Sequence, residues 1–357
     1  MQIPIFQVDA FTDTPFGGNP AGVVPEADDL TDEEMQKIAA EMKCSETAFV
    51  QKPDDPRATF KVRFFTPKEE VDLCGHATIG TFWLLAEKGY IKLKDPITIV
   101  SQQTGAGILP VGICSQNGKI HKVMMVQARP EFSGELTEFA QKINPDFSSE
   151  LDAVKELAEI LGISTEDFII PERPMIKPFI ASTGLPDLLV PIKDRKTMDN
   201  LNPDMRRLAE FCRKLEVISV HAFTFDTVNP DSTVYCRDFA PVVGIDEESA
   251  TGTASGALGA FLTAFAHIPI KKEKVSIICE QGYTMGRPSK ILVEVDIIEE
   301  KSAHDHDVTI HTEAPADPGE CPLCSGGLQH EVHHYRLGNI KVGGRAVTVL
   351  EGKMKVK

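Results

Sequence analysis

The sequence has no cluster of basic residues and no long apolar run. Its 357 residues include 37 Lys and Arg against 53 Asp and Glu, for a net charge of −16. Nucleic acids and anionic membranes are therefore poor partners, because both are bound through grouped positive charge. No apolar stretch approaches the ~20 residues that cross a bilayer. Residues 1–6 (MQIPIF) also lack the basic start of a secretory signal. We therefore expect a cytoplasmic protein with no nucleic-acid or membrane partner.

The cysteines do not form a disulfide framework. Eight of them are scattered over positions 44 to 324, and in a chain of this length such scatter favours reduced thiols. The phosphate-loop motif and the G-x-G-x-x-G motif are both missing, which argues weakly against nucleotide binding. We therefore expect no nucleotide cofactor.

The sequence does contain a long-range repeat. Residues 63–67 (RFFTP) precede Cys74-Gly75-His76 at a gap of 7 residues from Pro67, and residues 237–241 (RDFAP) precede Thr251-Gly252-Thr253 at a gap of 10 from Pro241. An apolar helical stretch follows each copy. A duplicated strand–loop–helix unit indicates two similar domains that face each other, with both helix starts at one cleft.

The pattern of elements predicts an α+β fold. Strand-like segments outnumber helices, and each half is expected to wrap strands around one helix, at 75–87 and at 253–265. Two domains also fit the chain length. We place the first at 1–128, completed by a C-terminal strand at 345–357, and the second at 129–344. Residues 299–329 are polar and rich in Pro and Gly, and we interpret them as an excursion loop.

The two helix starts are candidate anion sites. Gly75 and Gly252 stand where the backbone turns, and the first N–H groups of a helix have no intrahelical partner. Two such ends would suit a small carboxylate or an enolate-like intermediate. The alternative is that glycine only permits close packing there. Glu46, between Ser45 and Thr47, is a candidate acid or base, although a single glutamate is more often a solvated surface residue.

Several segments together resemble the PhzF-like (phenazine biosynthesis-like) isomerase family, which has the diaminopimelate epimerase-like fold. The resemblance covers nearly the whole chain, in order. The matching segments are 9–11 (DAF), 16–23 (FGGNPAGV), 45–50 (SETAFV), 73–78 (LCGHAT), 248–254 (ESATGTA) and 342–352 (VGGRAVTVLEG).

The resemblance implies two pseudo-symmetric domains with the active site between them, and a homodimer. It implies that Glu46 is the acid/base glutamate and that His76 is the family's histidine. Thr253 stands where the phenazine enzyme has a serine, and Glu248 where it has an aspartate. The longer side chain of Glu248 moves its carboxylate by ~1.5 Å, which matters because proton transfer needs heavy atoms ~2.6–3.2 Å apart. The substrate is therefore not fixed by the family.

Cys74 distinguishes this chain from two-thiol racemases. Diaminopimelate epimerases and proline racemases carry one Cys before Gly in each repeat, but here the second copy has Thr251, which cannot form a thiolate. A two-thiol mechanism is therefore not expected. Cys74 either packs at the helix start or assists in the cleft.

By the resemblance, we interpret the chain as a metal- and cofactor-independent isomerase that moves a proton on a small carboxylate-bearing metabolite. Glu46, His76, Glu248 and Thr253 are the expected catalytic residues. Asn19, Cys74, Gly75, Gly252 and Ser255 are expected to bind the substrate.

Two alternatives stay open. One is a non-catalytic small-molecule or protein-binding member of the same fold. The other is a zinc-dependent hydrolase, because residues 330–334 (HEVHH) fit H-E-x-x-H and Cys321 and Cys324 form a C-x-x-C pair. A β-like stretch follows the histidines, and in a strand positions four apart lie ~13 Å from each other, too far to share one metal.

Overall fold

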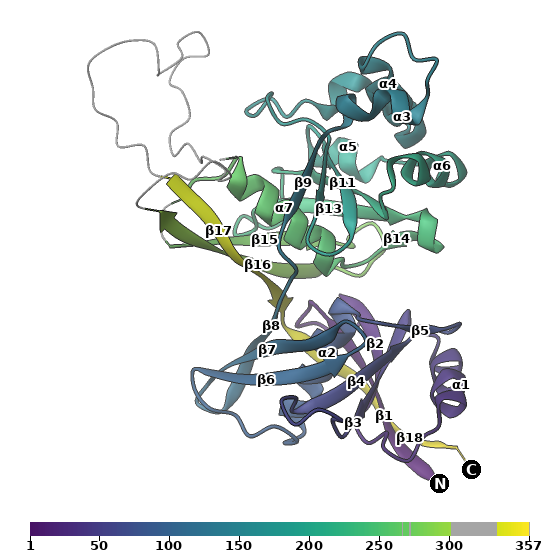
Figure 1. Ribbon diagram of the computed structural model, residues 1–357, viewed down its shortest axis with the longest axis vertical. Coiled ribbons are helices and arrows are strands. Elements are labelled where there is room, and N and C mark those ends of the chain that lie inside the picture. Colours follow the sequence, from purple (N-terminus) through teal and green to yellow (C-terminus); the bar gives the residue numbers. More distant parts are fainter. Residues whose placement is uncertain (266, 271–272, 301–333, 357) are drawn as a thin grey trace.

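The computed structural model describes residues 1–356 except 266, 271–272 and 301–333. Figure 1 shows two halves, one above the other, with both chain termini at the far end of the first half. The first half is built from the N-terminal part of the chain and the second half from the part that follows. The C-terminal strand then returns to the first half. The predicted α+β fold with a strand-wrapped helix in each half is confirmed.

The first half consists mainly of strands around helix α2. Its elements are β1 (Gln2–Ala10), β2 (Asn19–Val24), α1 (Asp32–Met42), β3 (Glu46–Gln51), β4 (Phe60–Phe65), β5 (Glu70–Val71), α2 (Gly75–Glu87), β6 (Ile97–Thr104), β7 (Gly107–Gln116), β8 (Lys119–Val126) and β18 (Ala346–Lys355).

The second half repeats this plan around helix α7 and adds helices on its outer side. Its first elements are β9 (Glu131–Glu135), η1 (Leu136–Phe139), α3 (Ala140–Ile143), α4 (Leu151–Leu161), η2 (Thr165–Phe168), β10 (Phe179–Ser182), β11 (Pro186–Pro191), α5 (Arg195–Asp199) and α6 (Met205–Leu215). Its remaining elements are β12 (Ser219–Thr224), β13 (Val234–Ala240), η3 (Pro241–Val243), β14 (Ile245–Glu248), α7 (Gly252–Ala264), β15 (Lys274–Gln281), β16 (Ser289–Glu300) and β17 (His334–Gly344).

Helices α2 and α7 are each enclosed by strands. Every residue from His76 to Ala86 is buried, and so is every residue of α7 except Thr253. A helix that is apolar on all sides is stable only when it is surrounded. Strands β1, β2, β3, β7, β8 and β18 contact α2, and β10, β11, β15, β16 and β17 contact α7. The two helices also contact each other.

Small residues let α7 lie close to its strands. A Cβ atom at Gly259 would lie 2.6 Å from Cγ1 of Val293, and one at Gly256 would lie 3.0 Å from Cγ2 of Val342. At Gly75 and Gly252, the glycines of the repeated motif, the nearest side-chain atoms would be 3.9 and 3.5 Å away, which is ordinary contact. Close packing therefore explains Gly256 and Gly259, and it does not explain the two repeated glycines.

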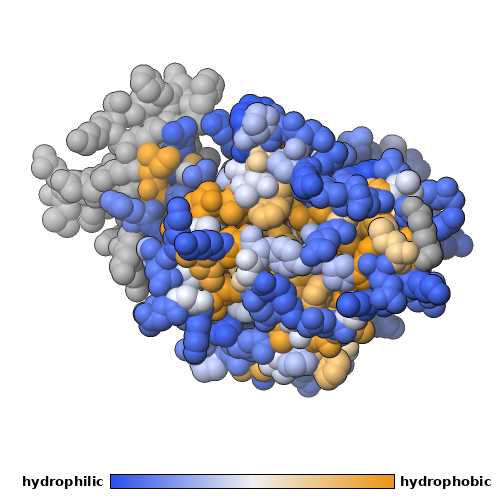
Figure 2. Space-filling view, turned by 90° about the horizontal axis from the view of Figure 1, so that it is seen from below, coloured by the Kyte–Doolittle hydropathy of each residue, from blue (hydrophilic) through white to orange (hydrophobic). Residues whose placement is uncertain are grey.

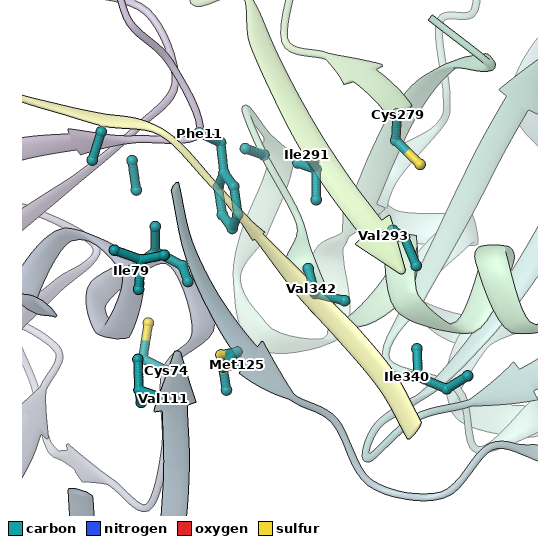
Figure 3. Packing of buried hydrophobic residues seen from close by; sticks show 14 of the residues in the cluster. Phe11, Cys74, Ile79, Val111, Met125, Cys279, Ile291, Val293, Ile340 and Val342 are labelled. Carbon is teal, nitrogen blue, oxygen red and sulfur yellow. The ribbon is translucent and has the colours of Figure 1, made fainter. Parts of the chain in front are cut away.

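Strand pairing and a shared core join the two halves. Strand β17 pairs with β16 of the second half and, through Lys341–Gly344, with β8 of the first. Strand β18 then pairs with β1 along its whole length. Figure 3 shows Phe11 and Met125 between Cys74 and Ile79 on one side and Ile291 and Val342 on the other, within one buried cluster. The domain boundary near residue 128 stays a prediction.

The surface carries scattered apolar side chains. Figure 2, which views the molecule from below, shows apolar areas broken up by hydrophilic side chains. In the first half the exposed large apolar residues are Met1, Phe16, Tyr90, Ile97, Ile99 and Leu350. Among the helices of the described residues, none has both the length and the apolar character needed to cross a membrane. Six cysteines of the described residues are free thiols: Cys44, Cys74, Cys114, Cys212, Cys236 and Cys279.

Candidate active site

The first part of the site lies where β3 begins and α2 starts. Helix α1 ends at Lys43 in a left-handed turn (φ 56°), and three residues later the chain enters β3 at Glu46. Oε2 of Glu46 lies 3.3 Å from Nε2 of His76 in the first turn of α2. This oxygen is buried and makes no hydrogen bond of good geometry. A buried carboxylate oxygen with one neighbouring ring nitrogen is available for a substrate proton.

Two more groups surround the His76 ring. Oγ of Ser45 lies 3.2 Å from Nε2, and Sγ of Cys74, the N-cap residue of α2, lies 3.4 Å from Nδ1. Burial lowers the pKa of His76, against the opposing effect of Glu46, so the ring is neutral at physiological pH. His76 therefore acts as a neutral hydrogen-bonding group rather than as a cation.

Cys74 is held as a thiol. Complete burial and, next, the charge of Glu46 raise the pKa of Cys74 well above its usual value. A helix start can favour a thiolate, but here burial and the nearby carboxylates outweigh that effect. Cys74 therefore lies against His76 as a neutral thiol, and its substrate-binding role stays a prediction.

The second part of the site lies where β14 ends and α7 starts. Oγ1 of Thr251, the N-cap residue of α7, donates to Oε2 of Glu248 at 2.8 Å. Gln281 on β15 fixes this corner: its Nε2 donates to the Glu248 carbonyl at 2.8 Å and its Oε1 accepts from the Thr251 N–H at 3.1 Å. The Glu248 carboxyl is thus held at the start of α7.

Asn19 brings the two parts together. It opens β2 in the first half, is 4% exposed, and its Nδ2 donates to Oε1 of Glu248 and to the carbonyl of Ala250, both at 3.0 Å. Beside it, Oγ of Ser249 donates to the Gly18 carbonyl at 2.9 Å. The carboxyl from the second half is therefore positioned by a residue of the first half.

Glu248 is the carboxyl with a strongly shifted pKa. Removal of its carboxyl group from water, followed by the charges of Asp238 and Glu46, raises the pKa of Glu248 to about 8, although Thr251 and Asn19 donate to it. The mutual effect of Glu248, Glu46 and Cys74 places all three in one electrostatic neighbourhood. Environments that hold one carboxyl neutral beside another assign different chemical roles to the two.

Glu46, Cys74 and His76 also have the spacing of a small metal site. Each offers one donor atom, and these atoms lie within 4.8 Å of one another. A thiol ligand has to ionise to bind a metal, and the raised pKa of Cys74 opposes that ionisation. The arrangement therefore suits acid/base chemistry better than a resident ion.

The remaining predicted residues occupy different positions. Gly75 and Gly252 are the first residues of α2 and α7. The carbonyl of Thr253 accepts from Oγ1 of Thr183 at 3.0 Å. Ser255 is completely buried in α7, and its Oγ has no hydrogen-bond partner among the described residues. Their catalytic and binding roles stay predictions.

Three residues that shape the site were not predicted from the sequence. They are Thr251 in its role as hydrogen-bond donor to Glu248, and the two residues Gln281 and Asp238. Thr251 had a local signal, since it lies three residues after Glu248 and two residues before the predicted helix at 253–265. Gln281 and Asp238 had no local signal. They lie 33 and 10 residues from Glu248 in the sequence, and only strand pairing brings them next to it.

Two other features lie apart from these residues. A hollow of about 450 Å³ between the halves is lined by Thr12, Phe16, Tyr283, Lys290 and Arg345, among others, and by none of the predicted site residues. The C-x-x-C pair and residues 330–333 of the H-E-x-x-H match lie outside the described residues, as does most of the predicted excursion. The backbone of His334 begins strand β17.

The comparisons with known proteins identify the family. A central helix wrapped by strands in each half is the arrangement of the epimerase-like fold. Residues 8–316 match the family described as phenazine biosynthesis-like protein (PhzC-PhzF), and the chain belongs to it.

Relatives and solved structures agree with this assignment. The chain is 38% identical to the uncharacterized isomerase YfhB of Bacillus subtilis over 293 residues, 82% of this chain and 90% of that one. A Bacillus anthracis phenazine biosynthesis protein of the PhzF family has a similar structure, with a TM-score of 0.76, 28% identity and 99% of both chains covered. A hydroxyproline epimerase from Agrobacterium vitis, at 15% identity and a TM-score of 0.55 over 99% of this chain and 91% of that one, shares the fold.

Proposed function

We propose that the protein is a cofactor-independent isomerase that moves a proton on a small carboxylate-bearing metabolite, with Glu46 as general acid/base between the two halves. The isomerase class is supported by the family and by relatives named isomerases. The observation that carries the proposal is the pairing of Glu46, whose buried Oε2 lies 3.3 Å from the neutral His76 ring, with Glu248 across the seam.

In this mechanism Glu46 removes a proton from a carbon beside a carbonyl, carboxylate or alkene group. The proton held on Glu46 exchanges with solvent, and Glu46 then delivers a proton to another carbon of the same substrate, so the enzyme ends in its starting state. His76, Ser45 and Cys74 hold the Glu46 region in place.

Glu248 acts as a hydrogen-bond donor in its neutral form. Two ionised carboxylates would repel an anionic substrate, whereas a carboxylic acid can donate to its oxygen. The starts of α2 and α7, at Gly75 and Gly252, add backbone N–H groups for the same negative charge. We assign orientation of the substrate to Asn19, Thr253 and Ser255. We also expect a homodimer in the cytoplasm, on the grounds given with the sequence.

The test is exchange of solvent deuterium into carbon positions across a panel of small amino and unsaturated carboxylic acids. We expect carbon-bound deuterium with the wild type and none with Glu46→Gln, which keeps the shape of the side chain and removes the base. Glu41→Gln, the same change at an exposed position of α1, is the matched control and keeps full exchange. Full exchange with Glu46→Gln would refute the role of Glu46.

A non-catalytic scaffold predicts a different result. It would bind a carboxylic acid without exchange, and Glu46→Gln would leave its affinity unchanged. The raised pKa of Glu248 favours the enzyme, because strongly shifted titratable groups gather at functional sites. The zinc-hydrolase alternative is tested by elemental analysis, where stoichiometric zinc would support it.

A further inference from the structure

A group of buried polar side chains lies directly behind Glu248. Asp238 on β13 stands opposite Glu248 on β14 in the antiparallel register. Ser219 and His221 on β12 and Asp187 on β11 continue the group across the sheet. All four are at most 2% exposed. Opposed residues on antiparallel strands have Cβ atoms ~4.5–5.5 Å apart, so Asp238 and Glu248 interact directly, and two like charges there would repel.

The hydrogen bonds of Ser219 fix a proton on one of the two aspartates. Its Oγ lies 2.8 Å from Oδ1 of Asp187 and 2.8 Å from Oδ1 of Asp238. A serine hydroxyl has one proton to donate, and an ionised carboxylate can only accept. Both contacts are hydrogen bonds only if one aspartate is a carboxylic acid that donates to Ser219.

The His221 ring shows which aspartate carries that proton. Its Nδ1 lies 2.9 Å from Oδ1 of Asp238, while Nε2 is buried without a partner. A neutral ring with its proton on Nδ1 donates to Asp238 and leaves only a lone pair unpartnered at Nε2. Asp238 then receives two hydrogen bonds as the anion, and Asp187 is the acid. Burial and the charge of Asp238 raise the pKa of Asp187 well above its usual value, in agreement with this assignment.

We propose that Asp238 is a positioning residue whose buried negative charge, held by Ser219 and His221, keeps Glu248 in the neutral form that donates a hydrogen bond to an anionic carboxylate or enolate oxygen of the substrate. The proposal rests on the proposed function for the role of Glu248. It adds the group that sets the protonation of Glu248 and makes the site selective for anionic ligands.

The other groups that face Glu248 also affect the balance between its neutral and ionised forms. Asn19 of β2 and Thr251 at the start of α7 donate to the carboxyl and favour its ionised form. Glu46 of β3 is a further negative charge and acts in the same direction as Asp238. Among the charges that act on Glu248, Asp238 ranks before Glu46, and only burial has a larger effect. Removal of the Asp238 charge therefore takes away the largest effect after burial, and the pKa of Glu248 falls.

The experiment is a titration of the glutamate side-chain carboxyl carbons by ¹³C NMR on the full chain without substrate, with Glu248→Gln identifying the Glu248 resonance. In the wild type we expect the Glu248 midpoint at about 8. In Asp238→Asn it should move down by about one pH unit or more, because a like charge within a few ångströms has been removed. An unchanged midpoint in a folded Asp238→Asn variant would overturn the proposal.

Asp187→Asn is the matched control. It replaces a neutral acid by a neutral amide that can still donate to Ser219, so the Glu248 midpoint should stay within a few tenths of a pH unit of the wild type. A large shift in this variant with none in Asp238→Asn would place the charge on Asp187 and overturn the assignment. If Asp238→Asn does not fold, aspartate carboxyl labelling of the wild type decides: we expect Asp187 protonated and Asp238 ionised at pH 7, and the reverse overturns it.

The result of this titration is independent of the result of the deuterium exchange test for the proposed function. The titration needs no substrate, so it can succeed even if no acid in the panel exchanges deuterium. Where exchange occurs, the KM for the anionic substrate should rise in the wild type as Glu248 ionises, and this rise should begin at lower pH in Asp238→Asn. A purely structural role for Asp238 would lower kcat without moving that pH dependence.

Discussion

Glu46 and Glu248 are placed in different surroundings, and the difference follows from burial and from the neighbouring charges. Glu46 lies beside a neutral ring and is partly open to solvent. Glu248 is held by two donors, yet it lies opposite Asp238 and out of water. In Glu248 the unfavourable charge and the burial outweigh the donors, which is why its pKa is raised to about 8. Glu248 is thus a neutral acid at neutral pH, beside the second carboxyl of the site.

The raised pKa of Glu248 makes stability depend on pH. The folded protein binds this proton more tightly than the unfolded chain, where the usual value is 4.5. The contribution of Glu248 is therefore fully present below about pH 4.5 and is lost as pH rises through about 8. Between these two pH values the free energy of unfolding contributed by Glu248 falls by roughly 1.4 kcal/mol per pH unit. We predict that Glu248→Gln is more stable than the wild type at pH 9 and that the difference shrinks toward pH 5.

Denaturant unfolding at several pH values checks this prediction. The quantity to compare is the difference in free energy of unfolding between Glu248→Gln and the wild type, because other titrating groups cancel in it. The exposed Glu41→Gln variant should run parallel to the wild type at every pH. Parallel curves for Glu248→Gln as well would show that Glu248 titrates alike in both states.

Sequence reasoning reached the residues of this site that lie inside recognisable motifs. Glu46, His76, Asn19 and Glu248 could be chosen because their neighbours along the chain carry the family resemblance. Asp238 lies inside the second R-x-F-x-P segment, but nothing in that segment shows that it stands opposite Glu248. That contact depends on the register of β13 and β14, which the bulged pairing sets.

At the scale of elements, the repeated arginine makes the same kind of ion pair in both halves. Arg63 on β4 makes a two-pronged bond to Glu70 on β5, with distances of 2.7 and 2.6 Å. Arg237 on β13 makes the same bond to Glu247 on β14, at 2.8 Å for both contacts. Each pair ties a short strand to a longer one just before the start of α2 or α7. The motif therefore fixes the loop that presents each helix start.

The glycines of α7 lead to a prediction about packing. Alanine at Gly259 would place its Cβ 2.6 Å from Cγ1 of Val293, a stiff β-branched residue of β16. We predict that Gly259→Ala lowers the free energy of unfolding by roughly 1–3 kcal/mol. Gly75→Ala is the matched control, because its nearest non-helical atom would be 3.9 Å away, and alanine favours a helix. Urea unfolding measures both, and equal stability of the two variants would contradict the packing argument.

Helices were predicted where apolar periodicity was strong or the repeat pointed to them. The predicted helix 75–87 has the observed bounds, and 253–265 is displaced by one residue from α7. Helix α6 was missed, although Asp204 caps it and Leu208, Phe211 and Leu215 face the core at helical spacing. The four basic side chains of α6 make the segment polar on average, so its row of apolar residues was not recognised. Strand β14 is only four residues long, too short for a period-2 pattern.

At the scale of the whole molecule, the chain crosses between the halves more than once. It leaves the first half after β8, returns along β17 and closes the first sheet with β18. A C-terminal strand that completes the first half was expected from the family resemblance, whereas the pairing of β17 with β8 was not. Long-range pairing of this kind leaves no local mark in the sequence, because each strand only records which of its faces is buried.

A charged contact reinforces this seam next to the site. Arg287, between β15 and β16, donates to the carbonyls of Gly17 and Gly18 at 2.7 and 2.9 Å and to Oδ1 of Asp9 at 2.9 Å. Asp9 is 1% exposed, and its other oxygen accepts from the Phe16 N–H at 2.9 Å. These bonds hold the loop that leads directly into Asn19, the residue that reaches Glu248.

Removal of Arg287 should therefore weaken the fold and the site together. We predict that Arg287→Ala lowers the free energy of unfolding by roughly 3 kcal/mol, because it leaves a buried carboxylate with a single donor. Asp9→Asn in the same background should restore much of the loss, since no buried charge then remains. A double-mutant cycle by denaturant unfolding measures this coupling, expected at roughly 1 kcal/mol or more. Strictly additive losses would contradict it. Because the same loop carries Asn19, the single variant should also lower deuterium exchange, and the double variant should regain exchange only as far as it regains stability.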